Sequence, residues 1–346
     1  MPPKQIDLKK IKKILFVVMG GLGNLILTIP ALKTLRINIP RAKITLLLGE
    51  PYIENIIKDE NLYDDILLLD RRGKTKMTHV LDMVKQARNH QFDLAIVASH
   101  TNAFKSSFLL FCMRIPLRLG QDINGQSFFY THKIPLEQDT HETDGTCQVV
   151  GQLGLQRVMD SPQLTPTPRS AELAQQFLHD RGINSKENLI GIHPGSGFKQ
   201  KYKRWSHHKF ASLCDQLIDQ YQAQIVITGG PSEVSLANDI SKIMKGYPVN
   251  AAGKLSLNHT AALIQHCNLF ISNDSGLAHI AAAVQTPLIV LFGSTNEKRI
   301  APRGKNIHIL RRKKTSRKTP PSMLINAITE TDVLNQVKSI IKTKQS

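Results

Sequence analysis

The sequence has few aromatic and few acidic residues, and both shortages restrict its function. Phe, Trp and Tyr make up 5% of the 346 residues, with a single Trp. This composition disfavours a surface that stacks nucleic-acid bases. Asp and Glu number 27 against 45 Lys and Arg, which gives a formal net charge of +18. Such a charge predicts acidic partners, which are nucleic acid, anionic lipid surfaces or phosphorylated ligands. Because aromatic residues are few, we expect no nucleic acid among them.

Closely spaced cysteines are also lacking. The four cysteines are widely separated and form no CxxC pair: Cys112, Cys147, Cys214 and Cys267. This spacing is typical of reduced thiols and not of a disulfide or zinc framework. The sequence therefore predicts a cytoplasmic protein with no metal site.

No apolar run is long enough for a membrane-spanning helix. Lysines at 9–13 precede the apolar stretch 14–32, as in a signal peptide, but three glycines, Asn24 and Pro30 interrupt that stretch. The uninterrupted part, ILFVVM (14–19), is far below the ~20 residues that a span needs. We predict a buried strand, a glycine loop and a helix over 25–35.

Short apolar runs alternate with helical patterns twice along the chain. The main runs are at 14–19, 43–48, 65–70, 93–98, 189–195, 224–230, 269–271 and 287–293. Such alternation predicts α/β architecture with two Rossmann-like, doubly wound domains. We expect a first domain at 1–160, a linker at 161–170, a second domain at 171–328 and a final helix at 329–346. Ligands are expected at the carboxyl ends of the strands, in the cleft between the domains.

The stretch LFISNDSGLAHIAAA (269–283) reads as a strand, a polar turn and a helix. A helix that begins here directs unpaired N–H groups and its positive dipole end at the turn, which suits a phosphate or pyrophosphate. Ser275 and Gly276 would let an anion approach closely, and His279 lies one turn further on the same side. An ordinary helix capped by Asp274 or Ser275 is the alternative.

Two further loops follow strands in the second half: HPGSGFKQKYKRW (193–205) and TGGPSE (228–233). Ser196 and Gly197 are candidates to donate to phosphate oxygens, and Lys203 adds a positive charge above Trp205. Glu233 either accepts hydrogen bonds from a ribose or adenine, or complements a helix dipole.

The first loop, GGLGN (20–24), begins like a dinucleotide fingerprint. Gly21 and Gly23 fit its first two glycines, but Ile26 stands where the third should be. Glu50, after the second strand, is a candidate for the acid that binds a ribose. An NAD(P)-dependent oxidoreductase therefore remains an alternative.

The stretch 298–318 carries ten Lys and Arg residues and no acid. It is either a solvated basic loop or a contact for an anionic membrane or a phosphorylated acceptor.

Taken together, these stretches resemble glycosyltransferase family 9, the lipopolysaccharide heptosyltransferases. The matching pieces are ILFVVMGGLGNLILTIPAL, IGIHPGSG with KRW following, ITGGPSE, LSLNHTAALIQHCNLFISNDSGLAHIAAA and PLIVLFGST. They occur in the family's order and span nearly the whole chain.

The resemblance implies a GT-B fold, with the acceptor bound by the first domain and the nucleotide-sugar by the second. It implies an inverting enzyme that transfers heptose from ADP-heptose to a lipid A–core saccharide, at the inner face of the inner membrane and with no tightly bound cofactor. Carried onto this chain, the donor-binding residues are Ser196, Gly197, Lys203, Glu233, Asp274, Ser275, Gly276, Leu277 and His279.

One position departs from the family. The N-terminal loop of these enzymes ends in an Asp that is the proposed general base, and here Asn24 stands in its place. An amide cannot take a proton at neutral pH. Asp122 or Glu50 is a candidate to replace this base. Otherwise the reaction depends on stabilisation of the leaving group, or catalytic activity has been lost. Asn24 would then orient the acceptor hydroxyl or cap the helix. A weak or inactive nucleotide-sugar-binding protein is therefore a further alternative.

Overall fold

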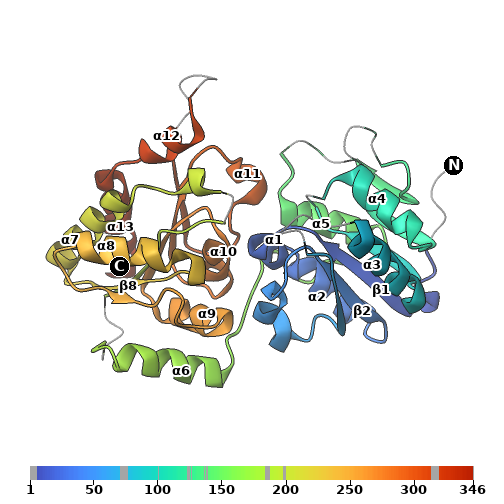
Figure 1. The fold of residues 1–346 in the computed structure, drawn as a ribbon, viewed down its shortest axis with the longest axis horizontal. Coiled ribbons are helices and arrows are strands. Elements are labelled where there is room, and N and C mark those ends of the chain that lie inside the picture. The colour runs from blue at the N-terminus through green and yellow to red at the C-terminus, as the bar shows by residue number, and fades with distance from the viewer. Residues whose placement is uncertain are drawn as a thin grey trace. The chain divides into compact units, whose positions relative to one another are not determined.

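The computed structural model describes residues 6–70, 77–99, 101–122, 125, 127–135, 137, 139–183, 188–197, 200–312 and 319–345. The chain divides into two compact units. The first unit is Met1–Pro162 with Lys298–Ile300, and the second unit is Gln163–Glu297 with Ala301–Ser346. Each unit holds one parallel sheet of six strands, with helices packed against it (Figure 1). The α/β architecture predicted from the alternating pattern is confirmed.

The first unit is built on a sheet with the strand order β3-β2-β1-β4-β5-β6. Its strands are β1 (Lys13–Val18), β2 (Lys43–Leu48), β3 (Asp65–Leu68), β4 (Leu94–Val97), β5 (Leu117–Asp122) and β6 (His132–Pro135). Its helices are α1 (Leu22–Leu27), α2 (Ile29–Asn38), α3 (Met77–His90), α4 (Ala103–Cys112) and α5 (Glu142–Gly151), with short 3-10 helices η1 (Leu8–Lys10) and η2 (Ile53–Glu60). The order reverses between β1 and β4, where ligands bind in sheets of this kind.

The second unit repeats this topology, with the strand order β12-β11-β10-β7-β8-β9. Its strands are β7 (Leu189–His193), β8 (Gln224–Ile227), β9 (Val249–Asn250), β10 (Leu269–Asn273), β11 (Leu288–Phe292) and β12 (Ile307–Arg311). Its helices are α6 (Pro168–His179), α7 (His207–Tyr221), α8 (Val234–Ile243), α9 (Leu257–His266), α10 (Gly276–Ala283), α12 (Pro321–Asn326) and α13 (Glu330–Gln345), with η3 (Lys201–Lys203) and η4 (Pro231–Glu233). Helix α11 (Glu297–Ile300) starts in this unit, and its residues 298–300 belong to the first. Here the order reverses between β7 and β10.

The central strands are buried along their whole length, which explains why they read as continuous apolar runs. Every residue of β10 and β11 is buried, as are five of the six residues of β1. A parallel sheet covered on both faces requires this pattern. In the second unit Trp205 packs edge-on against Phe210, with 5.1 Å between ring centroids, and its indole N–H donates to the Ile328 carbonyl.

Two boundaries differ from the sequence prediction. The helix predicted over 25–35 is two helices, α1 and α2, because Pro30 lies in the first turn of α2, the part of a helix that tolerates a missing N–H. The end of the predicted linker 161–170 is helical, because Thr167 caps α6 by accepting from the Ser170 N–H.

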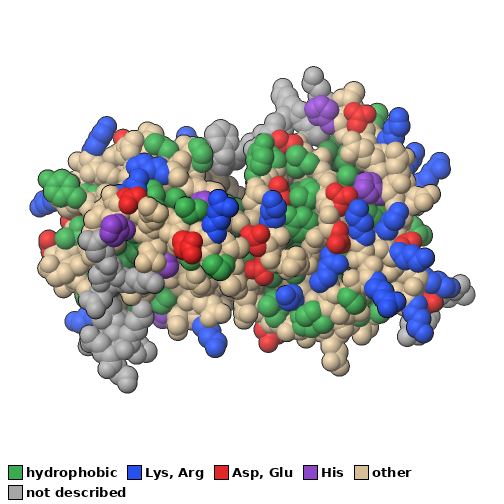
Figure 2. All heavy atoms as spheres, turned by 90° about the horizontal axis from the view of Figure 1, so that it is seen from below, with side chains coloured by type: hydrophobic (Ala, Val, Ile, Leu, Met, Phe, Trp, Pro, Cys, Tyr) green, Lys and Arg blue, Asp and Glu red, His purple; other side chains and the backbone are tan. Residues whose placement is uncertain are grey.

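The apolar stretch 14–32 forms β1, α1 and the start of α2. Within the part of the chain that is described, no helix is both long and apolar enough to cross a bilayer. Lys and Arg side chains are spread over the face drawn in Figure 2, with acidic side chains among them. In the basic stretch 298–318, Arg311 pairs with Glu297 and Arg312 with Asp332. The remaining part of that stretch, 313–318, lies outside the described residues.

Candidate functional site

In the second unit, the loop after β7 and the turn after β10 meet at the reversal of strand order. Both strands end side by side because β7 and β10 pair in parallel. Asn273 joins the two segments. Its Nδ2 donates to the carbonyls of Pro194 (2.8 Å) and Gly195 (3.2 Å), and its Oδ1 accepts from the Trp205 N–H at 3.2 Å. The amide of Asn273 therefore fixes both ends of the loop that carries Lys203.

A buried ion pair lies at this junction. Lys203 Nζ lies 2.7 Å from Asp274 Oδ2, and the two residues are 7% and 4% exposed. The hydroxyl of Thr295 donates to the same carboxylate oxygen at 2.7 Å. Burying two charges is favourable only when such partners satisfy them. Asp274 therefore holds the Lys203 ammonium in a fixed position beside the start of α10.

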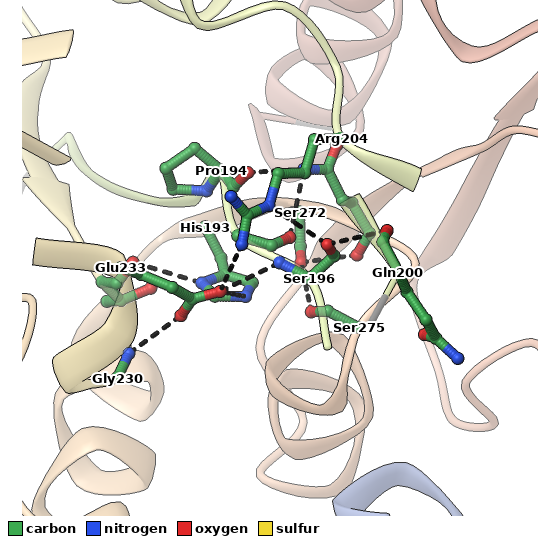
Figure 3. Close-up of polar contacts among 12 residues, drawn as sticks. His193, Pro194, Ser196, Gln200, Arg204, Gly230, Glu233, Ser272 and Ser275 are labelled. Carbon is green, nitrogen blue, oxygen red and sulfur yellow. Dashed lines mark hydrogen bonds and ion pairs between the residues drawn. The ribbon is translucent and has the colours of Figure 1, made fainter. Parts of the chain in front are cut away.

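Glu233 connects the loop after β7 to the loop after β8 (Figure 3). Its Oε1 accepts from the Ser196 N–H and its Oε2 from the Gly230 N–H, both at 2.9 Å. Arg204 Nη2 lies 3.8 Å from Oε1. Each carboxylate oxygen has a second lone pair that remains able to accept a ligand hydroxyl or amine.

Gly195 is required by this arrangement. A Cβ at Gly195 would lie 1.8 Å from Glu233 Oε1, whereas the nearest atom to a Cβ at Gly230 is 3.9 Å away. Glu233 can approach the loop only because the backbone there carries no side chain.

His193 lies beneath Glu233 at the end of β7. Its Nδ1 is 3.1 Å from the Thr228 carbonyl oxygen, so Nδ1 carries the proton, and its Nε2 is 4.0 Å from Glu233 Oε1. Burial lowers the pKa of His193, while the nearby Glu233 carboxylate acts in the opposite direction. A neutral imidazole results at pH 7.

Ser196, which the sequence predicts as a phosphate contact in the loop after β7, forms hydrogen bonds with other residues of the second unit. Ser196 Oγ donates to the Gln200 carbonyl at 2.9 Å and accepts from Arg204 Nε at 3.1 Å (Figure 3). Gly197 follows it, and a Cβ there would come no closer than 3.3 Å to the Gln200 side chain. Arg204 is a site residue that the sequence analysis missed, although it lies next to Lys203 in the same motif.

Helix α10 starts at the turn that follows β10. Ser275 is its N-cap residue, and within the described structure its side chain makes no capping hydrogen bond. Ser275 Oγ instead lies 3.2 Å from Ser272 Oγ. Gly276 and Leu277 open the helix, and His279 is buried in its first turn. The first N–H groups of α10 thus begin next to the Lys203–Asp274 pair, at the kind of helix end that suits an anion.

In the first unit, the loop after β1 brings Asn24 against helix α5. Asn24 Nδ2 donates to Glu142 Oε2 at 2.9 Å, and Glu142 is 2% exposed. Asn24 is the third residue of α1, whose N-cap is Gly21, so the interpretation of Asn24 as a helix cap is wrong. A Cβ at Gly20 would lie 2.3 Å from Asn24 Oδ1, which explains a glycine there.

Three carboxylates follow the strands of this sheet. Glu50 lies against the glycine loop, with Oε2 3.3 Å from the position of a Cβ on Gly21. Asp122 ends β5. Among the described residues, Glu142 is the one of these three carboxylates that accepts a hydrogen bond from Asn24. Sequence analysis missed Glu142, because it lies 118 residues from Asn24 in a helix that was not predicted.

The whole chain superimposes on solved structures of heptosyltransferases. The E. coli ADP-heptose lipopolysaccharide heptosyltransferase II matches with a TM-score of 0.77 at 21% identity, over 96% of this chain and 100% of that one. The E. coli heptosyltransferase WaaC with ADP matches with a TM-score of 0.72 at 19% identity, over 95% and 99%. The protein therefore has the GT-B fold of glycosyltransferases.

Sequence comparison gives the family. Residues 80–323 match the model of glycosyltransferase family 9 (heptosyltransferase). Lipopolysaccharide heptosyltransferase 3 of Escherichia coli is 30% identical over 284 residues, which cover 79% of this chain and 81% of that protein. The chain belongs to glycosyltransferase family 9, as its motifs predicted. Because this is a family of glycosyltransferases, we set the oxidoreductase alternative aside.

Proposed function

We propose that the protein is an inverting glycosyltransferase that moves a heptose, or a related sugar, from ADP-heptose to the lipopolysaccharide inner core. The observation that carries the proposal is the buried Lys203–Asp274 pair beside the N-terminus of α10. A leaving diphosphate needs fixed positive charge and N–H donors, and this junction offers both. ADP is supported as the donor nucleotide by the structural relatives, since the E. coli heptosyltransferase WaaC was solved with ADP.

The donor would lie along the second unit. Its diphosphate would contact Lys203, Ser275 and the first N–H groups of α10. Ser196 and Gly197, in the loop after β7, would border the same diphosphate. Glu233 would accept hydrogen bonds from the adenosine through the lone pairs that its backbone contacts leave available. Leu277 and His279 would border the sugar.

The reaction would be a single displacement. The acceptor oxygen forms a bond to the anomeric carbon while the bond from that carbon to the diphosphate oxygen breaks, through an oxocarbenium-like state. The electron pair leaves with ADP, where Lys203 and α10 stabilise it. Holding donor and acceptor in one geometry supplies a large part of the rate.

The proton of the acceptor hydroxyl requires a base, which Asn24 cannot be. We infer that Glu142 is that base and that Asn24 orients the hydroxyl beside it, in place of the Asp122 and Glu50 candidates. The support is the hydrogen bond from Asn24 Nδ2 to Glu142 Oε2, which holds a carboxylate next to the residue that replaces the family's Asp. The first unit would then bind the lipid-linked acceptor at the inner face of the inner membrane.

A transfer assay with ADP-heptose and a core-saccharide acceptor tests this function. Lys203→Ala should lower kcat by about 100-fold or more, since loss of a single preorganised contact to a leaving group has that effect. Asp274→Ala should also lower kcat, because Lys203 loses the carboxylate that holds its ammonium in place. Gly230→Ala is a matched control in the same site with room for its Cβ. Unchanged rates in both charge variants would refute the proposed site.

A further inference from the structure

The outer face of helix α4 carries phenylalanines that the proposed reaction does not use. Phe104, Phe108 and Phe111 are 46%, 46% and 51% exposed. Their spacing of four and three residues places them on one side of the helix. The nearby loop adds Phe128, which is 71% exposed, and the half-buried Phe129. We name these five residues the α4 phenylalanine surface.

Four of the five side chains form one contiguous cluster around Phe129, and Phe128 is its neighbour in the chain. The ring centroid of Phe129 lies 6.0, 5.3 and 5.1 Å from those of Phe104, Phe108 and Phe111. Arg118 fixes the loop by donating from Nε to the Phe129 carbonyl at 2.6 Å. Contiguous exposed apolar surface of this kind marks an interaction site, whereas scattered residues do not.

Cations accompany the rings, and acids are lacking. The Arg118 guanidinium lies 5.8 Å from the Phe111 centroid, and the Lys133 ammonium lies 5.9 Å from the Phe128 centroid. Lys105 and Arg114 are exposed on the same helix and just after it. The sequence at 101–121 and at 127–136 contains neither Asp nor Glu. The charged side chains that these two segments contribute are therefore all positive.

We propose that the α4 phenylalanine surface docks the protein onto a bilayer containing anionic phospholipids. The rings would enter the boundary between headgroups and acyl chains, and the four cations would contact lipid phosphates. A second copy of the chain fits less well, because a two-fold contact would oppose the same cations to one another. This inference rests on the proposed function only in that a lipid-linked acceptor resides in such a membrane.

Vesicle flotation of the full chain tests the proposal. Wild type should float with phosphatidylglycerol–phosphatidylethanolamine vesicles, and much less with phosphatidylcholine vesicles. Phe108→Ser with Phe111→Ser should weaken binding by about tenfold or more, because two aromatic side chains no longer enter the apolar layer. Ile243→Ser with Tyr247→Ser, which removes exposed apolar side chains from the second unit, should leave binding unchanged.

The electrostatic part is tested by Lys105→Gln with Lys133→Gln, which should lower binding to the anionic vesicles and reduce its salt dependence. Melting temperature and the thermal shift with ADP-heptose, measured without vesicles, should match wild type in every variant, so this inference can fail while donor binding succeeds. Unchanged vesicle binding in the phenylalanine variant would overturn the proposal. The proposal would also be overturned if the wild-type protein did not bind vesicles but formed a dimer that the phenylalanine variant dissociates.

Discussion

Asn24 Nδ2 donates a 2.9 Å hydrogen bond to Glu142 Oε2, so a carboxylate of helix α5 lies directly beside the amide at position 24. A carboxylate therefore lies within hydrogen-bond distance of position 24 although the residue there is an amide. An Asp at 24 would face Glu142 as a second carboxylate at hydrogen-bond distance. Ionising two carboxylates at this distance costs free energy because the like charges repel, which explains why an amide suits position 24 in this chain.

Exchanging the two groups should preserve activity. Glu142→Gln should lower kcat by about 100-fold, the range expected for loss of a general base. Asn24→Asp alone should lower both the rate and the stability, because it opposes two carboxylates. The double variant Asn24→Asp with Glu142→Gln restores one carboxylate and one amide, and should recover much of the rate in the transfer assay.

The pH profile separates catalysis from packing. The double variant should regain a pH-dependent kcat, whereas Glu142→Gln should show a rate that no longer falls as pH decreases through the carboxylate range. A higher rate in Asn24→Asp alone would contradict this account, because it would mean that position 24 holds a disabled base.

The contact between Glu233 and the loop after β7 predicts a large difference between two glycine variants. Gly195→Ala places a Cβ 1.8 Å from Glu233 Oε1, so the hydrogen bond from the Ser196 N–H must break. We expect a loss of about 1–3 kcal/mol in the free energy of unfolding and weaker ADP binding. Gly230→Ala should change neither quantity. Urea unfolding and calorimetric titration with ADP check this, and equal effects of the two variants would refute it.

His193 predicts a loss of stability on acidification. Burial lowers its pKa in the folded protein, and the unfolded chain has a value of about 6.5. Below that pH the unfolded state binds more protons than the folded state, so the free energy of unfolding falls as pH decreases. His193→Gln can still donate to the Thr228 carbonyl and should show a smaller decrease between pH 7.5 and 5.5 in urea unfolding. The same decrease in both proteins would rule out this role for His193.

The fold could be predicted from the sequence because its central strands are buried on both faces. Runs such as 14–19 and 287–292 are apolar throughout, and this pattern has few structural explanations. Strands β6 and β12, which the sequence analysis did not predict, include exposed positions and carry a mixed pattern that periodicity does not reveal.

Individual site residues could be predicted where a motif lies within one loop. Lys203 and Asp274 are each predicted from the motif of their own loop. Their contact, across 71 residues, arises from the pairing of β7 with β10. Contacts between distant elements could not be predicted. The partner of Asn24 depends on the position of α5, and the engagement of Glu233 by two backbone N–H groups depends on how two loops pack.

Donor binding tests the central claim most directly. Calorimetric titration with ADP-heptose, UDP-glucose and GDP-mannose should give saturable binding of ADP-heptose alone. Lys203→Met should weaken that binding by about tenfold or more, because a diphosphate loses its fixed positive charge. Circular dichroism would confirm that the variant is folded. Equal affinity of wild type and Lys203→Met for ADP-heptose, or no binding of ADP-heptose by wild type, would contradict the account.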